Sequence, residues 1–142
     1  DVVNTARITG GGITPITISE TIAAESTPIL NITKSVSPVP VTENGTLTYT
    51  FLIQNMGSAP ATVTTGATIT DTFNPILSGL TVTFNGTAWT APTNYTYNET
   101  TGLFATAAGQ ITVPAATFTQ DPETGAWVTT PGVSTLVVTG TI

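Results

Sequence analysis

Short runs of alternating apolar and polar residues, interrupted by glycine and proline, extend along the whole chain. The clearest run covers residues 46–55, where Leu47, Tyr49, Phe51 and Ile53 occupy every second position. A period of two predicts a strand with one buried face, and no segment of helical length shows the helical period. The pattern therefore predicts an all-β protein.

The other predicted strands are between 4 and 13 residues long. They cover residues 1–9, 13–25, 29–36, 59–65, 67–73, 80–84, 95–98, 102–106, 110–113, 116–120, 126–129 and 133–142. Asn85-Gly86 and the run 121–125 have the composition of hairpin turns, and Gly10-Gly11-Gly12 is expected to be a flexible hinge. Many short strands separated by frequent turn signals favour a β-sandwich.

The length of 142 residues suits one domain with an extended arm. We expect a donor strand and hinge over residues 1–12, a linker strand over 13–28 and the sandwich over 29–142. Threonine, valine and isoleucine are abundant, which suits pleated strands. Cysteine is absent, so stability must come from packing or from another kind of covalent bond.

The charge balance excludes several functions. Arg7 and Lys34 are the two cationic residues against eight acidic ones, which gives a net charge of -6. Nucleic acid is therefore not expected as a partner. No apolar run approaches the roughly 20 residues that span a bilayer, so membrane insertion is not expected. Without histidine no Ser/His/Asp set can form, and we expect no enzyme activity and no cofactor. Low charge with many Thr, Ser and Asn residues suits an extracellular protein.

Three polar residues are predicted to point into the core. Lys34 alternates in phase with Ile32 and Val36, and Asn4 and Asp71 likewise share their faces with apolar neighbours. Burial of an unpaired charge costs several kcal/mol, so the three groups are expected to meet. One interpretation is a buried Lys34–Asp71 ion pair, with Asn4 hydrogen-bonded elsewhere.

The other interpretation is an isopeptide bond between Lys34 and Asn4. A lysine removed from water becomes a nucleophile, which can attack the asparagine carboxamide and expel ammonia. A neighbouring carboxyl group polarises the carboxamide and carries protons, and Asp71 is the candidate for this role. Glu20 and Glu43 are the alternatives, although Glu43 lies at a predicted turn.

Four blocks of sequence resemble the repeat called domain of unknown function 11, found in surface proteins of Gram-positive and other bacteria. They are the segment from Leu30 to Pro38, Gly45-Thr46-Leu47-Thr48-Tyr49-Thr50-Phe51, Asn55-Met56-Gly57-Ser58-Ala59, and Ile69-Thr70-Asp71-Thr72-Phe73. The resemblance is good over residues 29–84 and only general over 90–130. It implies an immunoglobulin-like β-sandwich, and related surface modules often carry lysine–asparagine cross-links.

In this family the repeat ends with a strand similar to Asn4-Thr5-Ala6, which here stands at the front of the chain. The resemblance therefore implies that residues 1–9 are a displaced last strand, and it places Lys34, Asp71 and Asn4 on the family's lysine, aspartate and terminal asparagine. The strand either folds back into its own domain or completes the sandwich of another copy. We favour exchange between copies, because the natural path in a tandem array leads away from the following domain.

Other signals have simpler interpretations. Five sequons, at Asn31, Asn44, Asn85, Asn94 and Asn98, are candidate glycosylation sites. Asp121 and Glu123 could contribute to a calcium site, but they supply too few oxygen atoms, and a solvated turn is favoured. Trp89, Tyr95, Tyr97 and Trp127 could form a sugar-stacking platform, but packing in the core or in a hairpin is favoured.

Together these features predict a non-enzymatic structural subunit, with at most an autocatalytic cross-linking reaction. We expect a secreted homopolymer in a fibre or appendage on a cell or spore surface, joined head to tail by strand donation. The alternatives are an adhesin or glycan-binding module that recognises a host surface, and a passive spacer repeat of a longer surface protein.

Overall fold

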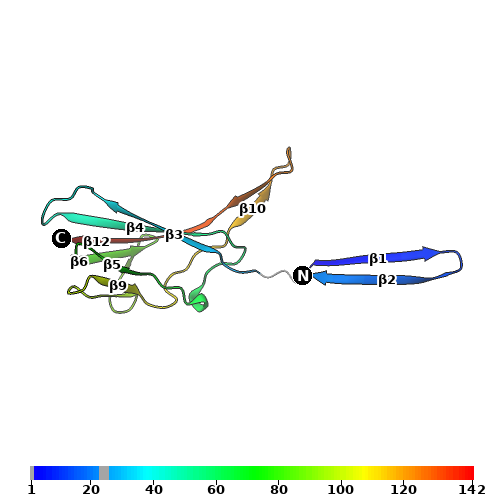
Figure 1. Cartoon of the computed structure of the whole chain (residues 1–142), viewed down its shortest axis with the longest axis horizontal. Helices are drawn as coiled ribbons and strands as arrows, with labels where there is room; N and C mark the ends of the chain where they lie inside the picture. The colour runs from blue at the N-terminus through cyan, green and yellow to red at the C-terminus, as the bar shows by residue number, and fades with distance from the viewer. Residues whose placement is uncertain (1, 23–25) are drawn as a thin grey trace.

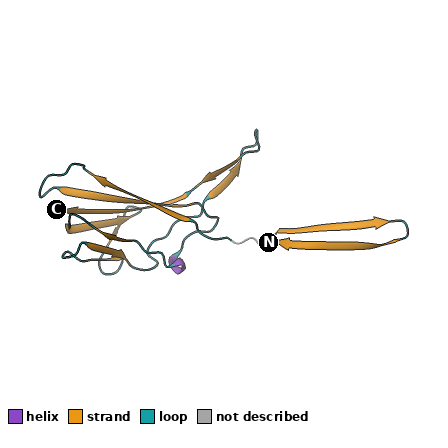
Figure 2. Cartoon of the chain, in the orientation of Figure 1, coloured by secondary structure: helices purple, strands orange, loops and turns teal. Residues whose placement is uncertain are grey.

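The computed structural model describes residues 2–22 and 26–142 of the chain, and it confirms the all-β prediction. Strands account for nearly all of the regular structure, and the one helical element in the described residues is a short 3-10 turn, η1 (Val63–Thr65) (Figure 2). Within residues 2–22 and 26–142, no helix has the length and apolar character to cross a membrane.

Two antiparallel sheets form the sandwich (Figure 1). The larger sheet has five strands in the order β3-β4-β12-β6-β7, and the smaller has three in the order β5-β9-β8. The larger sheet contains β3 (Leu30–Ser37), β4 (Thr46–Asn55), β12 (Gly132–Thr141), β6 (Ser78–Phe84) and β7 (Thr87–Trp89). The smaller contains β5 (Thr70–Thr72), β9 (Leu103–Thr106) and β8 (Tyr95–Tyr97).

The core lies between the two sheets and is built by alternation. Every second residue of β4 and β12 is buried, which leaves the intervening threonines and other residues nearer the surface. Tyr49 of β4 stacks on Phe73 with ring centroids 4.7 Å apart, and Phe73 contacts Phe104 of β9 at 5.7 Å. These aromatic contacts join the larger sheet to the smaller one.

Asn55, at the end of β4, is a fully buried polar residue with all its hydrogen bonds made. Its side-chain oxygen accepts from the backbone N–H groups of Ile29 and Gly57, and its amide donates to the carbonyls of Ala59 and Pro114. One side chain therefore fixes three separate loop segments around the end of β4.

Two hairpins stand outside the sandwich (Figure 1). One consists of β10 (Thr117–Gln120) and β11 (Trp127–Thr130), joined by the predicted turn at 121–125. The other, here called the arm, consists of β1 (Val2–Gly10) and β2 (Ile13–Ile22), which pair only with each other among the described residues.

The arm corrects two expectations about the first 28 residues. The glycine run is the turn of a hairpin rather than a flexible hinge: Gly10 pairs with Ile13, and Gly12 has a positive φ of 76°. Residues 13–22 are the second strand of this hairpin rather than a linker. A tight glycine turn permits the two alternating runs to align and satisfy each other's backbone groups. Residues 1 and 23–25 of the expected donor strand and linker lie outside the described residues.

Three other predicted strands are shortened or lost, and one strand was missed. Residues 59–65 contain a single bridge, Ala61 to Val113, and then η1, because the Thr65 hydroxyl accepts from the Thr62 N–H and closes a turn. The predicted strand 67–73 is reduced to β5. The predicted strand 110–113 contributes only the bridge at Val113. The short strand β7 follows the Asn85-Gly86 turn, where φ is positive at both residues.

Candidate functional site

The inward face of β3 is left open to solvent. Leu30, Ile32, Lys34 and Val36 pair directly with inward-facing residues of β4, so they share the face that packs on the smaller sheet. The partners on β4 are 0–6% exposed, whereas Ile32 is 47% exposed and Val36 38%. The difference arises because β3 is the edge strand and the described segments that face it cover it only in part.

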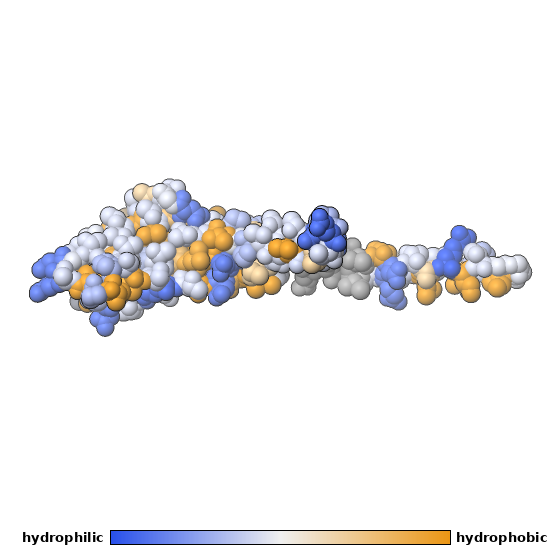
Figure 3. Space-filling view, turned by 90° about the horizontal axis from the view of Figure 1, so that it is seen from above, coloured by the Kyte–Doolittle hydropathy of each residue, from blue (hydrophilic) through white to orange (hydrophobic). Residues whose placement is uncertain are grey.

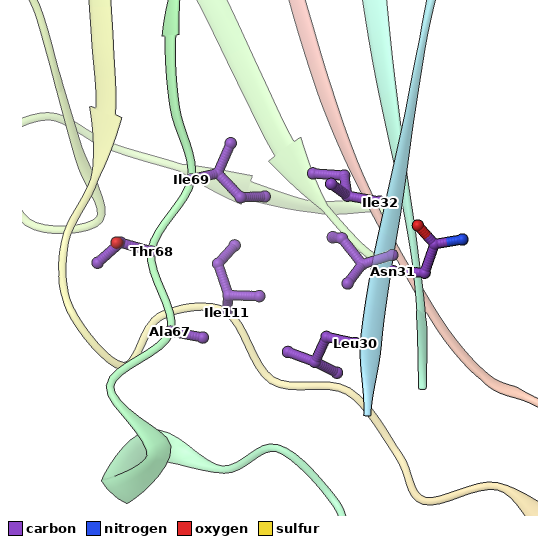
Figure 4. A pocket seen from close by; sticks show the side chains of 8 residues that line it. Leu30, Asn31, Ile32, Ala67, Thr68, Ile69 and Ile111 are labelled. Carbon is purple, nitrogen blue, oxygen red and sulfur yellow. The ribbon is translucent and has the colours of Figure 1, made fainter. Parts of the chain in front are cut away.

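An apolar pocket lies between β3 and the segment that leads into β5 (Figure 4). Leu30 and Ile32 point into it from β3, and Ala67, Ile69 and Ile111 point into it from the other side. Asn31, which alternates with them, points away from the pocket. We call this region, from the pocket along the inward face of β3 to Val36, the open groove.

Lys34 and Asp71 form an ion pair within the open groove. The lysine comes from β3 and the aspartate from β5, so the pair joins the two sheets. The side chain of Lys34 is 39% exposed and that of Asp71 is 19% exposed. Apart from this ion pair, no described residue contacts the buried Oδ2 of Asp71 through a hydrogen bond.

Aromatic rings line the floor beneath the lysine amine. Lys34 Nζ lies 4.6 Å from the ring centroid of Tyr49, 5.5 Å from Phe73 and 5.7 Å from Phe51. Ring faces attract a cation, so the amine is held in place on an apolar floor. A strand laid over the groove would remove this amine from water.

The open groove is bordered by unpaired strand edges. β3 pairs with β4 on one side, and β5 pairs with β9 on one side; neither has a second partner within residues 2–22 and 26–142. Unpaired edges present backbone N–H and C=O groups that can bind an added strand. The smaller sheet is also two strands narrower than the larger one.

The arm has one apolar and one polar face, and both are exposed. Ala6 pairs with Ile18 and Ile8 pairs with Ile16, so these residues share a face. Thr5, Thr17, Ser19 and Thr21 belong to the opposite face. In Figure 3 hydrophobic side chains gather along one edge of the arm. An isolated two-stranded hairpin with an exposed apolar face is marginal in water, which favours a partner for that face.

The structure brings together two of the predicted site residues and separates the others. Lys34 and Asp71 are in contact. Asn4 and Glu20 are direct cross-strand partners on the apolar face of the arm, so both lie outside the groove of their own chain's sandwich. Glu43 is exposed in the loop between β3 and β4, apart from this constellation. The pairing of Asn4 with Glu20 was not predicted, although the similar alternation on both sides of the glycine run was its signal.

The aromatic residues do not form one platform. Tyr95 is buried, and Trp89 stacks on Phe84 with centroids 4.8 Å apart. Trp127, by contrast, is 68% exposed on β11, where its face also carries Phe118 of β10.

The acidic turn at 121–125 is organised by its own backbone. Asp121 accepts hydrogen bonds from the N–H groups of Thr124 and Glu123, and these bonds hold the pKa of its carboxyl below the ordinary value. The described residues contain no group of three or more acidic side chains that could hold a metal ion.

The sequon asparagines fall into two groups. The side chains of Asn94 and Asn98 make hydrogen bonds within turns and loops, and that of Asn85 donates to Ser134 and accepts from the Thr135 N–H of β12. Asn31 and Asn44 are exposed on β3 and on the following loop.

Comparison with protein-family models, with curated proteins and with solved structures finds no match to this chain. The resemblance to the domain of unknown function 11 repeat therefore stays a prediction.

Proposed function

We propose that this chain is a structural subunit of an extracellular filament, in which the arm of one copy docks in the open groove of the next. The observation that carries the proposal is a complementary pair of surfaces on one chain: a sandwich with an uncovered apolar groove, and an arm with an uncovered apolar face. Because these surfaces differ, their contact is heterologous, and repeated contacts produce an open chain of subunits when the rotation between copies does not close a ring.

Burial of the arm supplies the driving force. The apolar face presents Ile8, Ile16 and Ile18, which are 56%, 58% and 66% exposed. Full burial of one such side chain contributes about 1.5–3 kcal/mol relative to full exposure. Docking of the arm would at the same time bury Ile32 and Val36 of the open groove. The polar face of the arm then becomes part of the outer surface.

A Lys34–Asn4 isopeptide bond is the second part of the proposal. The amine of Lys34 would attack Cγ of Asn4 in the incoming arm, form a new C–N bond and expel the carboxamide nitrogen as ammonia. Asp71 already contacts the amine and would accept its proton. Without cysteine, such a bond would give the filament a covalent link in which subunits separate only if an amide is broken.

Isotope mixing tests this proposal. Unlabelled and ¹⁵N-labelled chains are mixed as monomers, allowed to assemble, boiled in detergent and digested. We expect a ladder of covalent multimers and a peptide joining Lys34 to Asn4 with about half of its copies carrying one labelled and one unlabelled partner. If the two partners in every joined peptide carry the same label, the arm folds back into its own domain. The absence of multimers and fibres would exclude the filament.

A glycan-binding function is the second candidate, and it is supported by Trp127. An exposed tryptophan with Phe118 on the same face of a projecting hairpin can stack on a sugar ring. Binding of the wild-type chain to a glycan array, lost in Trp127→Ala, would support it. Equal binding by the two proteins would contradict it.

A further inference from the structure

The two sheets of the sandwich both end in an edge strand on one side. These strands are β3 of the larger sheet and β5 of the smaller sheet, and they face each other across the Lys34–Asp71 ion pair. The unpaired edge of β5 can be extended by the two strands of an arm. If β1 alone were added to the sandwich, β2 would have to separate from β1 and lose its backbone hydrogen bonds.

We infer that the arm of a second copy docks as an intact hairpin, with β1 beside β5, and so carries Glu20 together with Asn4 into the Lys34–Asp71 site. This inference rests on the proposed function. It assigns Glu20 as a second carboxyl of the cross-linking reaction, supplied by the same chain that supplies the asparagine.

The register of the arm places Glu20 there. Asn4 and Glu20 are directly opposite each other on the apolar face, and such pairs have Cβ atoms about 4.5–5.5 Å apart. When Asn4 lies beside Asp71 on the next strand, Glu20, Asn4 and Asp71 form a row across β2, β1 and β5. Adjacent strands are about 4.8 Å apart, so both carboxyls reach the central carboxamide. Lys34 faces this row from the other sheet.

The charges of the completed site explain why two carboxyls are useful. Asp71 neutralises Lys34 before docking, and Glu20 brings an additional negative charge into an apolar site. In the proposed reaction Glu20 acts in its neutral form, in which it can donate a hydrogen bond to the Asn4 carboxamide.

The proton transfers then balance. Asp71 accepts a proton from the Lys34 ammonium, which leaves a neutral amine. The amine attacks Cγ of Asn4 while Glu20 donates to the carboxamide, and the C–N bond to the leaving nitrogen breaks. The leaving nitrogen takes one proton from Glu20 and one from Asp71 and departs as an ammonium ion, while the proton lost by the attacking amine returns to Glu20. The products are one amide, one ammonium ion, ionised Asp71 and neutral Glu20. Neither acid is consumed.

Two full-length variants separate the two sides of the contact. Lys34→Ala can donate an arm but cannot accept a covalent bond, and Asn4→Ala can accept but cannot donate. After boiling, their mixture is expected to contain a covalent dimer and no multimer larger than the dimer. The absence of that dimer would contradict the proposed cross-link between copies. The role of Glu20 is then tested by measuring the rate at which this dimer forms.

The substitution Glu20→Gln is then placed on one chain at a time. On the Lys34→Ala donor it is expected to lower the maximal rate of dimer formation by about a hundredfold, the range of a general acid, with the half-saturating donor concentration unchanged. On the Asn4→Ala acceptor it is expected to have no effect. Glu43→Gln on the donor is the matched control and should leave the rate unchanged.

Two results would overturn the role of Glu20 while leaving the filament intact. One is an unchanged maximal rate with Glu20→Gln on the donor, whether or not the half-saturating concentration rises. The other is equal slowing when the substitution is placed on the acceptor, because the glutamate would then act within its own sandwich or on folding.

Discussion

Lys34 of β3 and Asp71 of β5 come from opposite sheets and form an ion pair at the open side of the sandwich. This contact connects two edges that share no backbone hydrogen bonds. A charge pair in such a place can serve stability or chemistry, and the following predictions separate the two.

Replacement of Asp71 by Asn is expected to affect cross-linking far more than stability. Lys34 is 39% exposed, so the loss of the ion pair should cost about 1 kcal/mol or less. The loss of a proton acceptor for the amine should slow the covalent ladder strongly. Chemical denaturation and boiled gels measure the two effects, with Asp121→Asn as a matched carboxylate control. A ladder that forms at the wild-type rate in Asp71→Asn would exclude the aspartate from the reaction.

Lys34→Arg is expected to keep docking and lose the covalent bond. A guanidinium preserves the positive charge beside Asp71 but does not act as an amine nucleophile at neutral pH. Fibres should still appear in the microscope, boiled samples should run as monomers, and intact mass should not fall by the mass of one ammonia per subunit. Asn4→Ala should also give monomers after boiling, whereas Asn31→Ala, on the outer side of β3, should leave the ladder unchanged. Mass loss in Lys34→Arg would contradict the assignment.

Neighbouring residues of β2 offer a matched test of the apolar face. Ile18→Asp places a charge on the face proposed to dock, and Thr17→Asp places one on the opposite face. Both residues are exposed in the arm, so neither change should unfold the sandwich. Ile18→Asp should abolish fibres in sedimentation and microscopy, because an unpaired buried charge costs several kcal/mol, while Thr17→Asp should assemble. Loss of assembly in both variants would indicate that the two faces of the arm are equivalent.

Asn55→Ala is expected to destabilise the sandwich by about 2–4 kcal/mol. The substitution removes four hydrogen bonds and leaves the backbone groups of Ile29, Gly57, Ala59 and Pro114 without their partner. Urea unfolding measures this change. The control is Asn31→Ala at an exposed position, where the change in the free energy of unfolding should be near zero. A loss below 1 kcal/mol would show that water replaces the side chain.

The β10–β11 turn should weaken only in strong acid. Backbone hydrogen bonds from Thr124 and Glu123 lower the pKa of Asp121 below its ordinary value of 3.8. A lowered pKa means that the contribution to stability is fully present above the ordinary value and is lost as pH falls through the lowered one. Amide exchange of Thr124 should therefore be constant from neutral pH to about pH 5 after correction for intrinsic rates. Faster corrected exchange already at pH 5 would contradict this prediction.

Much of the sandwich could be predicted because burial is periodic. The alternation in residues 46–55 coincides with β4, and Lys34 could be placed on the inward face from its apolar neighbours. The arm was harder to predict, because a glycine run can act either as a hinge or as a turn, and only the pairing of the two flanking runs decides between them. The turn η1 was also missed, since threonine is common in strands but can equally close a short turn through its hydroxyl.

The separation of arm and groove on one chain has a consequence for growth. In a filament assembled through this contact, one terminal subunit keeps an empty groove and the opposite terminal subunit keeps an undocked arm. The two ends therefore differ chemically, and a filament of this kind has a direction. A foreign protein could anchor such a polymer by offering only a groove, or halt its elongation by offering only an arm, and neither would need to resemble the whole subunit.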